Sequence, residues 1–524
     1  MTISDNHKNF RFPQQINHHS LHFDLDTADT ATQLTQLTMA PIATLLPMLL
    51  FYFPSLYRTC TNLKYHTPTS SRRTLWSTST TSLRAATTCE PVSVPTISSS
   101  PLSLTIPELS QILNGKGKAQ ACWDCFRLGV DPLWYYSDAN TDAHTMDQEP
   151  LEPILQQALQ AQQGTKTSQA WTREQLQAQI LPRRQSQGLG QQSLQTYRTA
   201  FFPSTQVMDS MSSIAQLSQI HSSNDGTTKL LLELQQDKLQ VECVIIPWPE
   251  RKTSTLCVSN QVGCGQGCTF CSTGRMGELR SLSADEILVQ AYWAAKVARI
   301  LPRLYPVDAT VFMGMGEAAR NVVNVVKAAQ VLTDPQLFQL APRRVTISTV
   351  GPTPQAFHDL GRAPAVLAWS VHASCDKVRN QLVPSTRHSM VELRDALIQV
   401  LLERPRKLRQ VMLEFALIGC LNDRPQDAHH LVQFCRAFYQ NVPGVKLVVN
   451  LIPWNDISAS SGPAVDYQKP SAASVETFQS ILVKHNILCY VRTTRGDDES
   501  AACGQLATKS KRYRSTTVQQ ISNE

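Results

Sequence analysis

The sequence predicts an α/β fold: a partial (β/α)6 barrel, preceded by a small helical domain and a disordered N-terminal extension. Three observations predict it. From about residue 228 to residue 507, apolar strand-like runs alternate with amphipathic helical patterns. Residues 101–227 carry helical patterns without such strands, and residues 1–100 carry neither. Alternating strands and helices are typical of a parallel sheet wound by right-handed crossovers.

Composition limits the class of protein. The chain has 524 residues, of which 42% are hydrophobic and 17% charged, as in ordinary soluble enzymes. Its net charge of +7 is compatible with a nucleic-acid substrate but too small to indicate one. The 14 cysteines are spread irregularly over a long chain, which favours reduced thiols and a metal site over a disulfide-stapled secreted domain.

The N-terminal extension contains a candidate targeting segment at residues 39–100. The apolar run MAPIATLLPMLLFYFPSLYR begins at Met39 and is too short and too rich in proline to span a bilayer. The Ser/Thr-rich tract after it is nearly free of acids, as in organellar transit peptides. We therefore expect the protein to be located in an organelle, with the plastid as the first choice and the mitochondrion as the second. The alternatives are a cytoplasmic protein with a disordered extension, or a true start at Met39.

Residues 101–227 predict a helical domain. Its Gln-rich stretches LQQALQAQQ and RRQSQGLGQQSLQ are interpreted as loops or surface insertions. Cys122 and Cys125 form a CxxC pair without a second pair, so we interpret them as ordinary cysteines of a helix.

The core domain is expected at 228–507, with a tail at 508–524. TKLLLELQ and QVECVIIP predict a β-hairpin, and TLCVSN leads into a cysteine loop. Ser283 and Glu286 form a capping box that opens a helix at 284–300. About six strand–helix units follow, which favours a partial barrel over an open doubly wound sheet. The later strands are ATVFMG, RRVTIST, AVLAWSVHA, QVMLEFALI, KLVVNLIPW and LCYVRTT, and the helices between them include 321–333, 390–403, 427–440 and 473–486.

The cysteine loop GCGQGCTFC places Cys264, Cys268 and Cys271 in a CxxxCxxC spacing. Three thiolates leave one iron of a four-iron cluster without a protein ligand, and that iron is open to a cofactor such as S-adenosylmethionine. Zinc is an alternative, although no fourth ligand lies nearby in the sequence. A further alternative is that these cysteines are structural or form a disulfide.

Polar residues follow several of the predicted strands, where a barrel gathers its functional groups. They are the Gly314–Glu317 turn GMGE, which contains Gly316, and then Ser348, Ser370, His372 and Asn455. Any one of them alone is better explained as structural. Their convergence on one barrel mouth indicates ligand contact.

The last strand is followed by RGDDESAACGQL, and here the chain resembles the RlmN/Cfr-type radical S-adenosylmethionine RNA (adenine) methyltransferases. The resemblance runs from about Lys229 to Leu506 and includes VECVIIP, TLCVSNQVGC, CTFCSTG, GMGE, RRVTISTVG, LAWSVHA, NLIPWN and RTTRGDDESAACGQL. GKGKAQACWDCFRLGVDP is similar to the family's small RNA-contacting domain.

The resemblance implies roles for single residues. It assigns a [4Fe-4S] cluster to the three loop cysteines and makes Cys503 the methylated cysteine. Cys257 is implied to form a transient disulfide with Cys503, and Glu242 to accept a proton. Contacts to S-adenosyl-L-methionine fall on Gly316, Glu317, Ser348, Ser370, Val371, His372 and Asn455. One departure is Ala318, where the family usually has a proline that stiffens the turn.

The implied reaction is methylation of adenosine at C2 in 23S-type ribosomal RNA, in the dual-specificity branch that also modifies transfer RNA. Cys503 takes a methyl group, a 5′-deoxyadenosyl radical activates it, and Cys257 releases the product. The expected partners are ribosomal RNA, transfer RNA and a reduced flavodoxin or ferredoxin. The enzyme itself is expected to be a monomer without membrane attachment. The alternatives are C8 methylation of the same RNA, a radical enzyme with a non-RNA substrate, and a zinc-bound RNA-binding module.

Overall fold

The computed structural model describes residues 100–137, 148–162, 171–180, 188–203, 209–458 and 467–508. The expected targeting segment (39–100) and the C-terminal tail therefore lie almost entirely outside the described residues. Within the described ranges, no helix combines the length and apolar character needed to cross a membrane.

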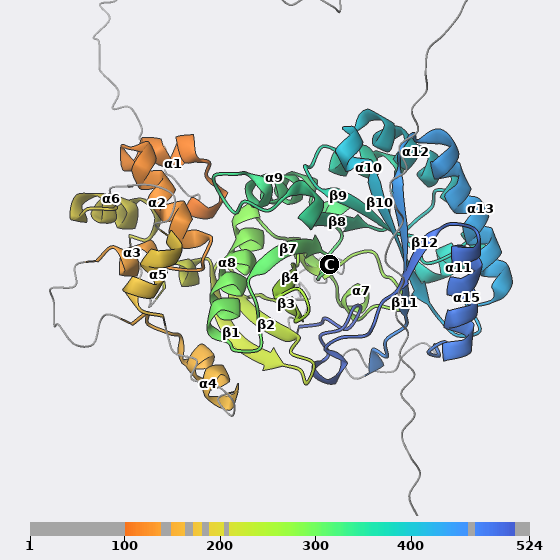
Figure 1. Cartoon of the computed structure of the whole chain (residues 1–524), viewed down its shortest axis with the longest axis horizontal. Helices are drawn as coiled ribbons and strands as arrows, with labels where there is room; N and C mark the ends of the chain where they lie inside the picture. The colour runs from red at the N-terminus through yellow and green to blue at the C-terminus, as the bar shows by residue number, and fades with distance from the viewer. Residues whose placement is uncertain are drawn as a thin grey trace, which may run out of the picture. The chain divides into compact units, whose positions relative to one another are not determined.

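The core of the molecule is a ten-stranded sheet with the order β1-β2-β3-β4-β7-β8-β9-β10-β11-β12 (Figure 1). Strands β1 to β4 pair antiparallel, and from β4 to β12 each strand is parallel to the next. The strands are β1 (Ala215–Ser222), β2 (Thr228–Leu234), β3 (Gln240–Trp248), β4 (Thr253–Cys257), β7 (Val307–Phe312), β8 (Val345–Thr349), β9 (Val366–Ser370), β10 (Gln410–Leu417), β11 (Lys446–Pro453) and β12 (Leu488–Val491).

Helices cover the outer side of the curved parallel part, as the alternating pattern predicted (Figure 1). The capping box of Ser283 and Glu286 is present at the start of α8. The partial (β/α)6 barrel expected from the sequence is confirmed, and β1 and β12 do not pair with each other. The helices are α8 (Ala284–Ile300), α9 (Val322–Thr333), α10 (Pro354–Gly361), α11 (Asp376–Leu382), α12 (Met390–Glu403), α13 (Pro425–Asn441) and α15 (Ala472–Lys484).

The cysteine loop has local structure that the sequence did not predict. β5 (Gln261–Cys264) and β6 (Gly277–Ser281) form a separate two-stranded sheet, with α7 (Ser272–Met276) between them. Cys264 therefore ends a strand, and Cys271 caps the start of α7. Short 3-10 helices lie at Pro101–Ser103 (η1), Ser210–Ser213 (η2), Ala318–Arg320 (η3), Pro342–Arg344 (η4), Arg406–Leu408 (η5) and Asp497–Glu499 (η6).

The N-terminal region is helical, as expected, with two differences. The first Gln-rich stretch forms most of α4, and the end of the second forms the first turn of α6, so the interpretation as loops was wrong for these parts. Leu155 and Leu159 are buried at helical spacing, which explains why the segment is ordered as a helix. The sheet also begins at β1, before the boundary expected at 228. The helices are α1 (Ile106–Leu113), α2 (Lys116–Phe126), α3 (Pro132–Tyr135), α4 (Pro153–Gln162), α5 (Arg173–Ile180) and α6 (Gln191–Phe201). Both CxxC cysteines are buried in α2.

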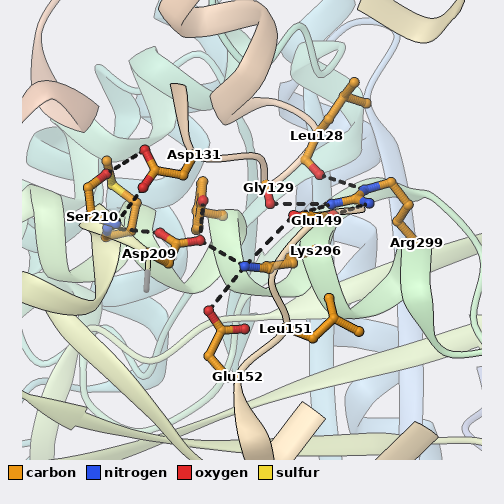
Figure 2. A network of polar contacts seen from close by, with 12 residues as sticks. Leu128, Gly129, Asp131, Glu149, Leu151, Glu152, Asp209, Ser210, Lys296 and Arg299 are labelled. Atoms are coloured by element: carbon orange, nitrogen blue, oxygen red, sulfur yellow. Dashed lines mark hydrogen bonds and ion pairs between the residues drawn. The ribbon is translucent and has the colours of Figure 1, made fainter. Parts of the chain in front are cut away.

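A buried polar network joins the N-terminal region to α8 (Figure 2). Lys296 Nζ lies 2.9 Å from Asp209 Oδ2 and 3.1 Å from Glu152 Oε1. Arg299 Nη1 lies 2.7 Å from Glu149 Oε2. Because these side chains are buried, their charges are compensated within the protein rather than by water.

Candidate active site

A cavity of about 370 Å³ opens at the C-terminal ends of the parallel strands. That size is in the range of sites for cofactor-sized ligands. Side chains from the cysteine loop, the ends of β4, β7, β8 and β9, and the C-terminal segment after β12 contribute to the wall. The predicted site residues in this wall are Cys257, Cys264, Cys268, Cys271, Gly316, Glu317, Ser348, Ser370, His372, Asn455 and Cys503.

The cysteine loop is fixed from two sides. Thr269 N donates to the carbonyl of Leu382 at the end of α11, at 3.0 Å. Ser272 N donates to the carbonyl of Gly504 in the C-terminal segment, at 2.7 Å. Burial raises the pKa of the Cys264 thiol to about 12 and that of Cys268 well above its ordinary value. These thiols therefore stay protonated until a positive metal centre replaces the protons.

The donor set fits an iron–sulfur cluster better than a single zinc ion. Among the residues that the structure describes, no group of three or more His, Cys, Asp or Glu side chains converges where one metal ion could be held. A tetrahedral zinc site needs such convergence. The three loop cysteines all line the same cavity, and a four-iron cluster would bind each thiolate through a different iron.

The GMGE turn requires its two glycines because it packs against the end of β4. A Cβ on Gly314 would lie 2.8 Å from Ser259 Oγ and from the carbonyl of Val258. Gly316 has φ +108°, and a Cβ there would lie 2.7 Å from the side chain of Gln261. Both contacts are closer than real Cβ atoms approach, so only glycine lets the turn line the cavity.

Glu317 lies at the cavity wall with its carboxylate already well bonded. Its Oε1 accepts from Ala319 N at 2.9 Å and from the Thr349 hydroxyl, and its Oε2 accepts from Val350 N at 2.9 Å. Burial raises the pKa of Glu317, while these hydrogen bonds act in the opposite direction. The turn therefore holds a carboxyl in one orientation before any ligand binds.

Ser348, Ser370 and His372 lie together at the ends of β8 and β9. The hydroxyl oxygens of Ser348 and Ser370 are 3.2 Å apart. Ala416 N donates to His372 Nδ1 at 3.0 Å, which leaves the ring proton on Nε2. Burial, and to a smaller extent the charge of Arg379, lower the pKa of His372 well below its ordinary value, so the ring is neutral and offers a donor.

Two expected ligand contacts are engaged in other bonds. Asn455 lines the cavity, but its Nδ2 donates to the carbonyl of Cys503 at 3.1 Å and its Oδ1 accepts from the Thr494 hydroxyl. Asn455 thereby positions the C-terminal segment. Val371 is fully buried behind the wall and not part of it, and its N–H donates to the carbonyl of Glu414.

Cys257 and Cys503 face the same cavity, although they are far apart in the sequence. Cys257 ends β4, and Cys503 lies in the loop after η6. Desolvation among the cavity residues raises the pKa of Cys257 to about 12 and that of Cys503 to about 11, although Cys503 is exposed at the surface of the cavity, and the Cys503 charge contributes to the shift of Cys257. The two thiols are thus electrostatic neighbours, and both are free, as are the other described cysteines.

Glu242, the expected proton acceptor, lies beside the cavity and not in its wall. Glu242 lies on the same face of β3 as Val244 and Ile246, which line the cavity. Lys229 Nζ lies 3.2 Å from its Oε1, and Ala507 N donates to its Oε2 at 2.9 Å. Burial raises the pKa of Glu242, and Lys229 is the main influence that lowers it.

Two cavity residues were missed by sequence reasoning or left unassigned. Glu414 on β10 is buried, and its Oε1 accepts from Asn450 Nδ2 at 2.8 Å. Arg492, next to β12, acts electrostatically on both Glu414 and Cys503. A single acid inside the apolar run QVMLEFALI was the signal that could have identified Glu414, because an unpaired charge is costly in a buried strand.

Comparisons with known proteins agree with this geometry. The chain is 39% identical over 289 residues to the dual-specificity RNA methyltransferase RlmN of Syntrophotalea carbinolica, covering 55% of this chain and 71% of the relative. It is 39% identical to the protein of the same name from Marinobacter nauticus, covering 57% and 79%.

A solved structure is also similar. The radical SAM methyltransferase from Sphaerobacter thermophilus is 28% identical, with a TM-score of 0.57, over 77% of this chain and 98% of that one. No family model matches the chain. The identity to curated relatives over most of their length, together with the cysteine-lined barrel mouth, shows that the chain belongs to the RlmN family of radical S-adenosylmethionine RNA methyltransferases.

Proposed function

We propose that this protein methylates C2 of an adenosine in 23S-type ribosomal RNA and an adenosine of transfer RNA by the same chemistry. The observation that carries the proposal is the meeting of five cysteines at one cavity, namely the CxxxCxxC triplet with Cys257 and Cys503. Metal binding alone does not require the last two. Carbon C2 of adenine is electrophilic, so direct attack by that carbon on a methyl sulfonium is unfavourable, and a protein thiol has to carry the methyl group.

The loop cysteines would hold a [4Fe-4S] cluster, and the strand-end residues would hold S-adenosylmethionine beside it. When bound, this pair supplies an oxidising carbon radical that the protein cannot make from its own side chains. The residues supply orientation. Glu317 presents a fixed carboxyl, His372 a neutral N–H donor, and Ser348 and Ser370 a pair of hydroxyls.

Cys503 would accept and carry the methyl group. In a displacement at the methyl carbon, a bond forms between Cys503 Sγ and that carbon while the carbon–sulfonium bond breaks, and the thiol proton is lost. Desolvation of the thiol among the cavity residues opposes this deprotonation, since it raises the pKa of Cys503 to about 11. A sulfonium cation beside the thiol favours the thiolate, because an opposite charge lowers a thiol pKa.

Cys257 and Glu242 would release the product from Cys503. Once the carbon carried by Cys503 has bonded to C2 of the base, Glu242 would take the C2 proton while the unpaired electron left by the radical addition returns to the cluster, and Cys257 as thiolate would attack Cys503 Sγ. A sulfur–sulfur bond would form, the bond from Cys503 Sγ to the transferred carbon would break, and its electron pair would stay on that carbon, which takes up a proton and becomes the methyl group. A reductant of the thiol class then returns both cysteines to the free state.

The remaining partners follow from the chemistry. The RNA base must leave its stack to reach a barrel mouth. We propose a small reduced carrier protein, a flavodoxin or ferredoxin, as the electron donor, and a monomeric enzyme. We also propose an organellar location, with the plastid first, on the composition of residues 39–100.

Anaerobic reconstitution followed by mass spectrometry tests the function. We expect a brown protein that contains iron and sulfide, methylated Cys503, and 2-methyladenosine in ribosomal RNA. Cys503→Ala should abolish the RNA product, whereas Cys375→Ala should leave it intact, because Cys375 is exposed and outside the cavity wall. An 8-methyladenosine product would overturn the C2 assignment, and a colourless zinc protein would overturn the radical mechanism.

A further inference from the structure

Arg379, in α11, bonds the backbone behind the cavity wall. Its side chain is completely buried, although it carries the most strongly ionised group among the amino acids. Its guanidinium is bonded to backbone carbonyls only. Nη1 donates to the carbonyls of Ser370 at 2.5 Å and Val371 at 2.8 Å, and Nη2 donates to the carbonyl of Val350.

These bonds tie together two strand ends of the cavity wall. Val350 follows β8, and Ser370 ends β9. The next residue after Val371, His372, has φ +58°, a conformation that a non-glycine residue keeps only when its surroundings hold it. The planar fork of arginine suits such bridging, because it donates in several fixed directions at once.

The charge of Arg379 has no direct counter-ion. Among the described residues it forms no salt bridge, and its Nε is buried without a hydrogen-bond partner. Glu317 acts on it electrostatically, but the carboxylate of Glu317 is bonded to the Thr349 hydroxyl and to backbone amides. Burial lowers the pKa of Arg379 to about 10, so it stays charged at neutral pH. An unpaired buried charge is costly and favours an anion nearby. Arg404 shows that carbonyl bonds alone can also hold such a charge, so the neighbours of Arg379 decide where an anion would lie.

The side of Arg379 that faces the cysteine loop shows where that anion belongs. Val350, whose carbonyl accepts from Arg379 Nη2, belongs to the same cluster of buried residues as Cys268. Val378 and Leu382, on either side of Arg379 in α11, pack in one apolar cluster with Cys268 and Cys271. The helix that carries the cation therefore also supports the loop that carries the thiols.

We propose that Arg379 is the buried counter-cation of the iron–sulfur cluster and the positioning residue of the S-adenosylmethionine wall. The inference rests on the proposed function, because it assumes a cluster on the loop cysteines. A four-iron cluster with three thiolates is anionic and gains one more negative charge on reduction. A fixed cation beside it stabilises the reduced form and raises its reduction potential. The same guanidinium holds the carbonyls behind Ser370 and His372, so it also keeps the ligand-binding wall in shape.

Three variants of the full chain, reconstituted without oxygen, separate the two roles. Arg379→Gln removes the charge, and Arg379→Lys keeps the charge but loses the fork. Arg404→Gln is the matched control, because Arg404 is also buried, also bonds backbone carbonyls only (Ala363 and Ala365), and lies outside the cavity wall. The measurements are iron and sulfide content, the reduction potential from a dithionite titration followed by electron paramagnetic resonance, the Kd of S-adenosylmethionine, and Tm with and without the cluster.

We expect a more negative potential and a smaller gain in Tm on cluster uptake for Arg379→Gln. Arg379→Lys should keep the potential of the wild type but bind S-adenosylmethionine about ten-fold more weakly, and Arg404→Gln should keep both properties. If Arg379→Gln does not fold, a wild-type potential in Arg379→Lys supports the counter-cation role and a more negative one contradicts it.

The outcomes distinguish this inference from the proposed function. A wild-type protein that takes up no iron and sulfide would overturn the function, and with it the inference. A wild-type protein with a normal cluster, together with an Arg379→Gln variant of unchanged potential and unchanged gain in Tm, would overturn the counter-cation alone. An unchanged Kd in Arg379→Lys would overturn the positioning role.

Discussion

Glu414 is a carboxyl of the cavity wall in which only one oxygen has a hydrogen-bond donor among the described residues. Its Oε1 accepts from Asn450, and the described residues donate no hydrogen bond to its Oε2. Its charge acts on the thiol of Cys503, as does that of Arg492. Glu414, Arg492 and Cys503 line the same cavity, and the carboxylate and the guanidinium act on the Cys503 thiol in opposite directions.

Glu414→Gln should therefore slow methyl transfer to RNA about ten-fold, or about 1.4 kcal/mol of activation free energy. Glutamine keeps the size of the side chain but removes the negative charge that acts on Cys503. Single-turnover assays with separately methylated enzyme measure the step, and Glu403→Gln on the exposed end of α12 is the control. Equal rates in both variants would show that Glu414 only fills space.

Lys229 controls the proton acceptor of the proposed mechanism. Burial raises the pKa of Glu242, and the Lys229 ammonium 3.2 Å away favours the ionised form. Lys229→Met removes that cation, so the pKa of Glu242 rises further. A base must be ionised to take a proton, so the acidic limb of the pH–rate profile should move to higher pH. Lys229→Arg should restore the limb, and an unmoved limb in Lys229→Met would exclude Glu242 as the base.

At the scale of elements, the turn after β7 shows how the chain accommodates Ala318 at the position where the family usually has proline. Ala318 begins η3, and Glu317 before it has φ −114° and ψ 117°, which is the backbone conformation that precedes a proline. The side chain of Glu317 caps η3 by accepting from Ala319 N. The turn is therefore held by its own glutamate, without the stiffening that a proline would add.

Ala318→Pro should raise the free energy of unfolding by about 0.4–1 kcal/mol, because proline restricts the unfolded chain at a position whose conformation it can adopt. Urea denaturation of the two proteins measures the difference. Ala318 is fully buried, so the ring must fit among its neighbours. A loss of stability would show that it does not fit.

The elements that sequence reasoning predicted are those with a strong periodic pattern. The capping box at Ser283, the helices around the barrel and the parallel strands appear as expected. β1, β5, β6, α7, α10 and α11 were not predicted; none is longer than eight residues, and several are held by contacts with distant segments. Thr269 with Leu382 is one such contact. Glu317 and Cys503 could be placed at one site because parallel strands end on the same side, but the bonds of Asn455 could not be foreseen.

At the scale of the molecule, the N-terminal region is joined to the barrel through Lys296. Its ammonium contacts Asp209 and Glu152. Both carboxylates are separated from Lys296 by long stretches of chain. No local pattern predicts such a network, because each charge alone resembles an ordinary surface residue in the sequence. Figure 2 shows Lys296 as the point where these carboxylates meet. The integrity of both parts should depend on it.

Lys296→Met should lower the free energy of unfolding by about 3–5 kcal/mol, since it leaves buried carboxylates without their cation. Lys484→Met on the exposed end of α15 is the control and should change little.

The penalty should also depend on pH. Burial alone lowers the pKa of Lys296, but Asp209, Glu152 and Glu149 together raise it, so in the wild type its contribution persists through neutral pH. In the variant the pKa of Glu152, which burial raises and Lys296 lowers, rises further. A group with a raised pKa stabilises the folded state at low pH, and that contribution is lost as pH rises through the folded pKa. The loss in Lys296→Met should therefore be larger at about pH 8 than at about pH 5 in urea denaturation. An equal loss at both values would mean that packing, and not charge, holds the N-terminal region to α8.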